Sequence, residues 1–173
     1  MTAFWRAAGP SKWFSKDADF DREIAARFQA THEAAAAGHL SDWEATPDGA
    51  LALLILLDQF PRNMFRCSAR AFATDPLARA VADRAIARGF DARVAAAERV
   101  FFYLPFEHSE NLADQERSLA LWRQSGSGEI DKYAQIHADI IRRFGRFPHR
   151  NAVLGRATTP EERAFLDAGG FAG

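Results

Sequence analysis

The stretch TPDGALALLILLDQFPRNMFR, residues 46–66, decides the fold. It opens with Thr46, Pro47 and Asp48, which supply an N-cap, a first-turn proline and an acid that complements the helix dipole. The residues that follow are apolar on nearly every side until Asp58, so the pattern predicts a helix in the centre of the fold. Pro61 is expected to stop or kink this helix.

The same helix signals recur along the rest of the chain. Asp17 and Gly38 bound a predicted helix over 19–37, and Ser41 with Glu44 predicts a capping box for a short turn. A helix that begins near residue 96 is expected to stop at Pro105. Other helix starts are expected at Thr74-Asp75-Pro76, at Ser109, near Tyr133 and at the capping box Thr159-Pro160-Glu161-Glu162.

Apolar residues at helical spacing predict which faces of these helices point inward. The expected inward residues are Leu77 and Val81, then Leu112, Leu119 and Trp122, then Tyr133, Ile136, Ile140 and Phe144 before Gly145, and finally Phe165 and Leu166.

No segment alternates apolar and polar residues as a strand would, so the sequence predicts an all-α fold. Seven to nine helices joined by short loops are expected to pack as antiparallel neighbours, either in a compact bundle or as stacked helix hairpins. The Ser125–Gly128 stretch reads as a loop between helices, and residues 1–173 are expected to form one domain.

The composition excludes several classes of protein. The chain has 173 residues, of which 48% are hydrophobic, and a net charge of −1, which argues against a disordered chain and a globally basic nucleic-acid binder. Its longest apolar run, 50–57, is too short to cross a membrane. The first twenty residues do not resemble a secretory signal, and Cys67 has no second cysteine to pair with. We therefore expect a soluble cytoplasmic protein.

Polar residues at the end of the central helix form the first of three candidate segments. Asp58 and Gln59 interrupt the apolar run, and Arg62 and Asn63 follow at once. A buried carboxylate requires a partner, because an unpaired buried charge is strongly unfavourable. We expect Asp58 to pair with Arg62.

The second segment, residues 104–119, is acidic. Glu107 and His108 precede the expected N-cap Ser109, while Glu110 and Asp114 share a helix face, as do Asn111 and Gln115. Like charges at this spacing repel, so arginines from elsewhere are expected beside them. His108 is a candidate general base next to carboxylates, or else a residue that caps the helix.

The third segment, RRFGRFPHRNAVLGR at 142–156, holds five arginines, one histidine and no acid. Arginine forks bind carboxylates and phosphates, so the segment suits an anionic ligand, a nucleic-acid backbone or the acidic second segment. The charge balance between the segments favours internal pairing.

No sequence signature of a metal site or of a bound cofactor is present. We expect neither a metal nor a cofactor. Cys67 follows Arg66, which can activate a thiol, but a lone cysteine is more often a small buried residue.

Taken together, LLDQFPRNMFR (56–66), LPFEHSENLADQ (104–115) and FGRFPHRNAVLGR (144–156) resemble a bacterial family known only as domain of unknown function 924. Trp13-Phe14 and AFATDPLARAVADRAIARGFD (71–91) add to the likeness. The resemblance implies a right-handed helical array similar to tetratricopeptide-repeat proteins, and no established activity. The family's motif positions correspond to Asp58, Gln59, Arg62, Asn63, Glu107, His108, Ser109, Glu110, Asp114, Gln115, Arg146, His149, Arg150, Asn151 and Arg156.

The leading functional hypothesis is a helical binding module with one Arg/His/carboxylate pocket. Arg62, Arg146 and Arg150 would hold a small anionic molecule or a peptide carboxylate. The full predicted ligand-binding set is Asp58, Gln59, Arg62, Asn63, Glu107, Glu110, Asp114, Gln115, Arg146, Arg150, Asn151 and Arg156.

Two alternatives remain open. One is a hydrolase or transferase acting on a phosphorylated or carboxylated metabolite, with His108 or His149 as general acid or base. The other is a purely structural polar cluster that fixes the packing of helix ends. Nucleic acid and membranes are not expected partners.

Overall fold

The computed structural model describes residues 1–125 and 132–172. In these ranges the regular elements are helices and turns of helix, and no strand occurs, so the prediction of an all-α fold is confirmed. The chain divides into two compact units, Met1–Pro105 and Phe106–Gly173. The single domain and the repeat-like array stay predictions, and the predicted loop at 126–128 lies outside the described residues.

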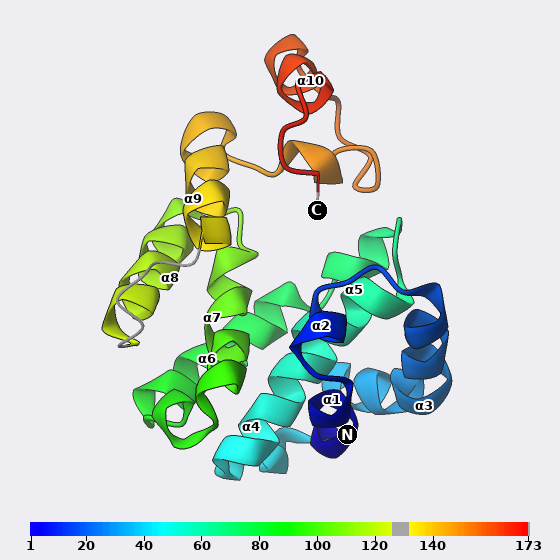
Figure 1. The fold of residues 1–173 in the computed structure, drawn as a ribbon, viewed down its shortest axis with the longest axis vertical. Coiled ribbons are helices and arrows are strands. Elements are labelled where there is room, and N and C mark those ends of the chain that lie inside the picture. The colour runs from blue at the N-terminus through cyan, green and yellow to red at the C-terminus, as the bar shows by residue number, and fades with distance from the viewer. Residues whose placement is uncertain (126–131, 173) are drawn as a thin grey trace. The chain divides into compact units, whose positions relative to one another are not determined.

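The helices of the first unit, shown in Figure 1, pack around an aromatic core that the ring contacts define. Trp5 stacks on Trp13 and Phe20 and meets the edges of Phe60 and Phe101. Helix α3 packs against α5, and α4 packs against α6. The α-helices are α1 (Thr2–Ala8), α2 (Pro10–Trp13), α3 (Ala18–Ala36), α4 (Pro47–Leu54), α5 (Phe60–Met64) and α6 (Asp75–Ala87).

Local capping explains where α3 and α4 begin. The Asp17 carboxylate accepts from the Asp19 and Phe20 amides, and the Thr46 hydroxyl accepts from the Gly49 amide, as predicted. The predicted capping box at residues 41–44 is wrong, because that 3₁₀ turn has no side-chain cap. Its Glu44 binds the Arg84 guanidinium instead, at 2.6 and 2.7 Å.

Pro61 does not end the central helix, which continues through it to Met64. A π turn, Ile55–Gln59, joins α4 to α5, with the Phe60 amide donating to the Ile55 carbonyl. The Leu57 carbonyl would meet the Pro61 nitrogen in an α-helix, but proline has no N–H to donate. The Thr74 hydroxyl donates to this carbonyl instead, at 2.6 Å.

The carbonyls on either side of Leu57 have side-chain donors as well. His32 of α3 donates from Nδ1 to the Leu56 carbonyl at 2.9 Å, and Arg62 donates to the Asp58 carbonyl at 2.6 Å. Three consecutive carbonyls of the π turn thus accept from side chains, which keeps buried acceptors satisfied where the helix is irregular.

One further local prediction is wrong. Pro105 does not stop its helix, because α7 runs from Val100 to Glu107 and a proline removes only one hydrogen bond from it. The predicted helix start at Thr74-Asp75-Pro76 is confirmed, because Thr74 is the N-cap residue of α6. The Thr74 hydroxyl is bound to the Leu57 carbonyl and does not cap the helix.

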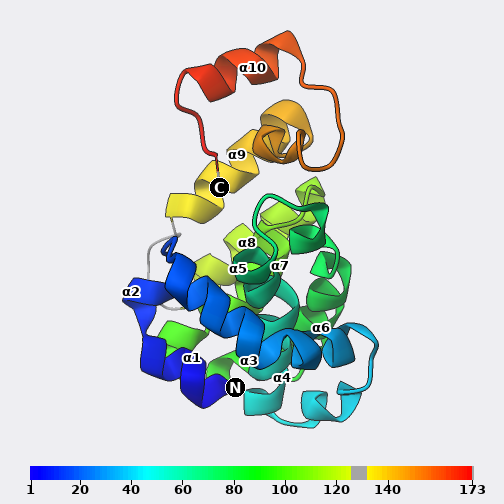
Figure 2. The same ribbon diagram turned by 90° about the vertical axis from the view of Figure 1, so that its right-hand side faces the viewer.

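In the second unit, α8 (Leu112–Gln124) packs beside α9 (Lys132–Phe144), as Figure 1 shows. A short 3₁₀ turn, Pro148–Arg150, and a loop lead to α10 (Pro160–Asp167). Figure 2 shows the chain running back from α10 toward α9, where Phe171 lies 4.6 Å from the His137 ring.

The observed ends of the helices in the second unit agree with some of the predicted caps and differ from others. The full capping box of Thr159 and Glu162 is confirmed, and Gly145, with φ of +69°, follows α9 as expected. The predicted N-cap Ser109 is wrong, because the Asn111 side chain accepts from the Ala113 amide and caps α8. Ser109 instead accepts from the Asn111 amide, which extends the turn before the helix.

The predicted inward stripes hold in the middle of the helices and fail at their first turns. Leu119 and Ile140 are buried, whereas Leu77, Leu112 and Tyr133 are exposed. Each exposed residue lies in the first turn of its helix, where neighbouring elements do not yet cover it. No helix in the described ranges is both long and apolar enough to cross a membrane.

Candidate functional site

The first candidate segment lies in the first unit. Arg62 donates to both oxygens of Asp75 at 3.0 Å and lies 3.2 Å from the Asp58 carboxylate, so the predicted Asp58–Arg62 pair is confirmed. Burial opposes the charge, but the attraction of Asp58 and Asp75 outweighs it and raises the pKa of Arg62. A second partner of Arg62, Asp75, lies thirteen residues away and was not predicted from the sequence.

The amides of this segment are also engaged within the first unit. Gln59 donates from its side chain to the Asp58 carboxylate. Asn63 donates to Asp21 of α3 at 2.7 Å, and Arg66 binds the same carboxylate. The bond from Asn63 ties α5 to α3, so it holds two helices together.

The second and third segments meet in the second unit, where the predicted pairing of acids with arginines is confirmed. Glu110 accepts from both terminal nitrogens of Arg156, at 2.6 and 2.9 Å, and from the Phe147 amide at 2.8 Å. Burial opposes ionisation, but these donors outweigh it and lower the pKa of Glu110. Arg142 likewise binds Glu116 at 2.5 Å.

Arg146 binds Glu162, the capping residue of α10. Its Nε and Nη2 lie 2.5 and 2.8 Å from the two carboxylate oxygens. Asn151 and the Thr159 amide donate to the same carboxylate. The Arg146 hydrogen bond is the main cause that lowers the pKa of Glu162 to about 2. Arg146 and Asn151 therefore fix α10.

Gln115 and Asp114 organise the turn between α7 and α8. The fully buried Gln115 amide donates to the carbonyls of Glu107 and Ser109, at 2.6 and 2.7 Å, and so closes the end of α7. The Ser109 hydroxyl donates to Asp114 at 2.6 Å. Both predicted site residues thus shape the backbone that carries Glu107 and His108.

Glu107 is buried and pairs with a histidine that the sequence analysis did not consider. The Nδ1 atom of His137 lies 2.9 Å from the Glu107 carboxylate and 2.7 Å from the Tyr133 carbonyl. Both neighbours are acceptors, so Nδ1 carries the proton and Nε2 is the acceptor of the neutral ring. The signal was present: residue 137 lies four residues after Tyr133 and three before Ile140, on the inward stripe of α9.

Two more histidines lie around this pair. The His108 and His137 rings are 6.2 Å apart, and Phe171 contacts His137 and His149 at 4.6 and 5.4 Å. We call His108, His137 and His149, with Glu107 and Arg150, the histidine cluster.

Arg150 gives the cluster a positive charge, and burial beside it keeps His149 neutral near pH 7. Arg150 is buried, donates to the His108 carbonyl at 3.0 Å and lies over the Phe147 ring at 4.4 Å. Burial, followed by the positive charge of Arg150, lowers the pKa of His149 to about 4. The His149 Nδ1 atom is buried and has no hydrogen-bond partner in the described parts of the chain.

Within residues 1–125 and 132–172, no three His, Cys, Asp or Glu side chains are grouped as metal ligands. The free Cys67 is exposed, with φ of +60°.

Known proteins place the chain in a family. Residues 1–170 match the family described as bacterial protein of unknown function (DUF924). The chain belongs to the DUF924 family. A solved structure with the description protein of unknown function ATU0120, from Agrobacterium tumefaciens, is 53% identical, with a TM-score of 0.92 over 96% of this chain and 94% of that one. No curated protein matches the chain.

The resemblance seen in the three motifs is thereby confirmed for this DUF924 protein. Its motif residues fall into two groups. Asp58, Gln59, Arg62 and Asn63 lie in the first unit, and the remaining motif residues lie in the second.

Proposed function

We propose that this DUF924 protein binds a small anionic molecule or a peptide carboxylate at the histidine cluster. The observation that carries the proposal is the buried Nδ1 of His149, which has no partner in the described residues. A buried polar nitrogen without a partner costs free energy, and a ligand oxygen that accepts from it would recover that cost.

The electrostatics of the cluster support an anion as the ligand. The positive potential of Arg150 and Arg156 disfavours a proton on His149, and the same potential favours a negative charge placed beside it. An anion at this position would in turn raise the pKa of His149. Binding would therefore take up a proton and would strengthen as the pH falls toward 4.

The proposal narrows the set of predicted ligand residues. Arg62, Arg146 and Arg156 each bind a carboxylate through two or more nitrogen–oxygen contacts, which supports the structural alternative for these three. Arg150 and His149 are the residues that we propose contact the ligand. The cytoplasm remains the proposed location, supported by a single cysteine that forms no internal disulfide.

Thermal shift and calorimetry with inorganic phosphate, acetate and short peptides test the proposal. We expect at least one probe to bind, and Arg150→Ala and His149→Asn to weaken it about tenfold or more, the effect of losing a charge-assisted hydrogen bond. Arg163→Ala on the exposed surface of α10 and His39→Asn on the exposed surface after α3 are matched controls. If both variants are folded and bind every probe as tightly as the wild type does, the proposal of a binding site at the histidine cluster is refuted.

The Glu107–His137 contact favours a second candidate function. A carboxylate that holds Nδ1–H leaves Nε2 oriented to accept a proton, as a general base requires. The enzyme alternative, a hydrolase or transferase of phosphorylated or carboxylated metabolites, would then use His137, with His108 and His149 nearby. A substrate screen decides: activity that survives His137→Ala, His108→Ala and His149→Ala excludes this role.

A further inference from the structure

The histidine cluster is closed in this structure, whereas the proposed ligand has to reach its interior. Glu107, His137 and Arg150 are buried, and so is the Nδ1 atom of His149. A ligand oxygen can accept from that nitrogen only after a covering group has moved away.

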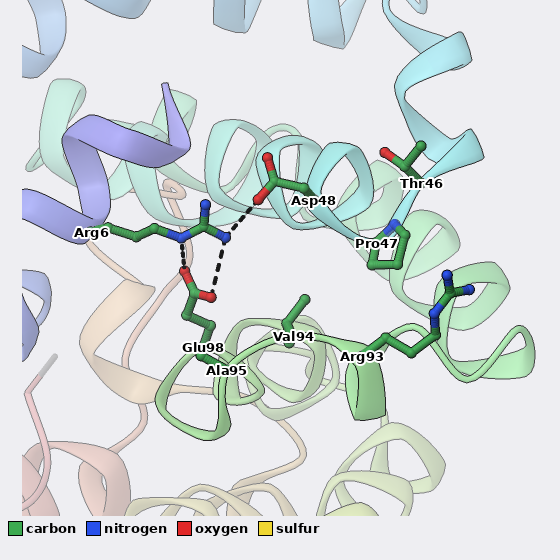
Figure 3. Close-up of a pocket in the computed structure, with 8 residues that line it drawn as sticks. All are labelled: Arg6, Thr46, Pro47, Asp48, Arg93, Val94, Ala95 and Glu98. Carbon is green, nitrogen blue, oxygen red and sulfur yellow. Dashed lines mark hydrogen bonds and ion pairs between the residues drawn. The ribbon is translucent and has the colours of Figure 1, made fainter.

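An open cavity of the first unit differs from the cluster in its polar groups. It has a volume of about 530 Å³, and only residues of the first unit line it. Figure 3 shows Arg6 already bound to both carboxylates of this cavity, to Glu98 at 2.6 and 3.2 Å and to Asp48 at 2.6 Å. Among the described residues that line it, none carries a buried polar atom without a partner. The unsatisfied nitrogen of His149 has no counterpart there.

Phe171 is the side chain that lies over two histidines of the cluster. Its ring centroid lies 4.6 Å from that of His137 and 5.4 Å from that of His149, with the edge of one ring toward the face of the other in both contacts. The half-buried ring also packs against the apolar core that contains Ile140 and Phe147. Movement of Phe171 would therefore uncover one side of both imidazoles.

The turn that ends α10 brings Phe171 to this place. Gly169 has φ of +78°, its amide donates to the Leu166 carbonyl at 3.0 Å, and the Gly170 amide donates to the Phe165 carbonyl at 3.0 Å. These two bonds form a Schellman motif, which ends a helix and turns the chain back. A Cβ on Gly170 would lie 2.5 Å from the Phe165 ring, so glycine lets the chain pass close to it. Figure 2 shows the segment after this turn running back toward α9.

Beyond Gly170 the segment is held by side-chain contacts. The backbone of Phe171 and Ala172 makes no hydrogen bond with the residues that the structure describes. Ring contacts of Phe171 with Tyr133, at 6.4 Å, and with His137 link it to α9. A segment with few buried contacts and no backbone hydrogen bonds opens at low cost in free energy.

We propose that residues 168–172 form a cover over the histidine cluster, which closes when Phe171 packs on His137 and His149 and opens to admit the ligand. This inference rests on the proposed function, because the cover controls access to the same binding site. The ligand binds the open state, so the apparent affinity falls in proportion to the fraction of molecules that are open.

Titration of the ligand-free protein tests the closed state. In NMR spectra of Phe171→Ala, the midpoint of His149 should rise from about 4 by about one pH unit or more, because water reaches the imidazole and stabilises its charged form. The titratable and charged groups that act on His149 are unchanged in this variant; they are Arg150, His137, Glu110 and Arg156.

Phe144→Ala is the matched control. Phe144 packs, half-buried, against the same apolar core, but its ring contacts that of Phe165 at 5.1 Å and, within the described residues, no histidine. The His149 midpoint should stay near 4 in this variant. Circular dichroism shows whether each variant is folded, and Phe171→Leu takes the place of Phe171→Ala if the alanine variant does not fold.

Calorimetry with inorganic phosphate and with acetate tests the opening. Minor conformations are commonly populated at about 0.1–10%, and a ligand that binds only such a conformation loses affinity by that fraction. Phe171→Ala favours the open state, so it should bind the probe about tenfold or more tightly than the wild type does. Phe144→Ala should bind the probe as the wild type does.

Three results would overturn the proposed cover. These are an unchanged His149 midpoint in a folded Phe171 variant, an equal rise of the midpoint in Phe144→Ala, and weaker binding of the probe by the Phe171 variant, which would make Phe171 a ligand contact. If the midpoint rises as expected but neither the wild type nor the Phe171 variant binds a probe, the cover is supported and the proposed function is refuted.

Discussion

Replacing Glu162 with glutamine isolates the value of one buried charge in the second unit. Gln still accepts from the Thr159 amide, so the capping box survives. The variant loses the negative charge that Arg146 contacts at 2.5 and 2.8 Å. Charged hydrogen bonds contribute about 1.5–3 kcal/mol, so we expect a loss of about 2 kcal/mol. For a chain of this length, that lowers Tm by about 4–8 °C.

The pH dependence predicts the direction in which the difference in Tm between the two proteins changes. The folded pKa of Glu162, about 2, lies below its ordinary value of 4.5, so the contribution of the charge to stability is complete above pH 4.5 and is lost as the pH falls through 2. The gap in Tm between wild type and Glu162→Gln should therefore shrink between pH 7 and pH 3. Thermal denaturation followed by circular dichroism measures it.

The neighbouring Glu161 provides the control for Glu162. It carries the same charge on the same helix, but its side chain is 65% exposed and pairs with the exposed Arg143. Glu161→Gln should change Tm little, since exposed pairs contribute about 0–1 kcal/mol. Equal losses in the two variants at pH 7, or a gap that does not narrow in acid, would refute the reasoning.

Three further predictions concern stability and titration. Thr74→Val should cost about 1–3 kcal/mol in urea denaturation, because it strips the donor from the buried Leu57 carbonyl, and a smaller loss would show that water replaces the hydroxyl. Gly49→Ala places a Cβ 2.1 Å from the Trp43 carbonyl and should lose about 1–3 kcal/mol; an unchanged Tm would contradict the close approach. His149 should titrate near pH 4 by NMR, and since this lies below its ordinary pKa of 6.5, it should reduce stability as the pH falls from 6.5 toward 4; a midpoint near 6.5 would contradict its burial.

Short-range features of this fold could be predicted from the sequence, because their causes lie within four residues. Thr46 and Thr159 cap their helices through amides three residues on, and Gly145 ends α9 with a positive φ. Asp58 and Arg62 are neighbours on one helical turn, so their pairing was also visible. In each case the interacting groups are close in the sequence, so local helix geometry alone brings them together.

Long-range partners could not be predicted in the same way. The sequence indicated that Asp58 needs a cation and pairs with Arg62, but only the packing of α6 on α4 brings Asp75 to the same guanidinium. The acidic and basic segments were expected to pair, yet their order, Glu110 with Arg156 and Glu116 with Arg142, depends on how α8 and α9 align. His137 was missed because its partner, Glu107, lies far from it in the sequence.

The π turn holds one residue more than an α-helix needs over the same turn. Deleting one residue within 55–59 should therefore restore an α-helical turn and leave the helix that follows in phase. Phe60 would keep its place against Trp5 and Phe28, whose ring centroids lie 5.5 and 5.2 Å from its own. A one-residue deletion in a regular α-helix would instead rotate everything after it by about 100° about the helix axis. The central helix should therefore tolerate the loss of one residue at the π turn better than a regular helix would.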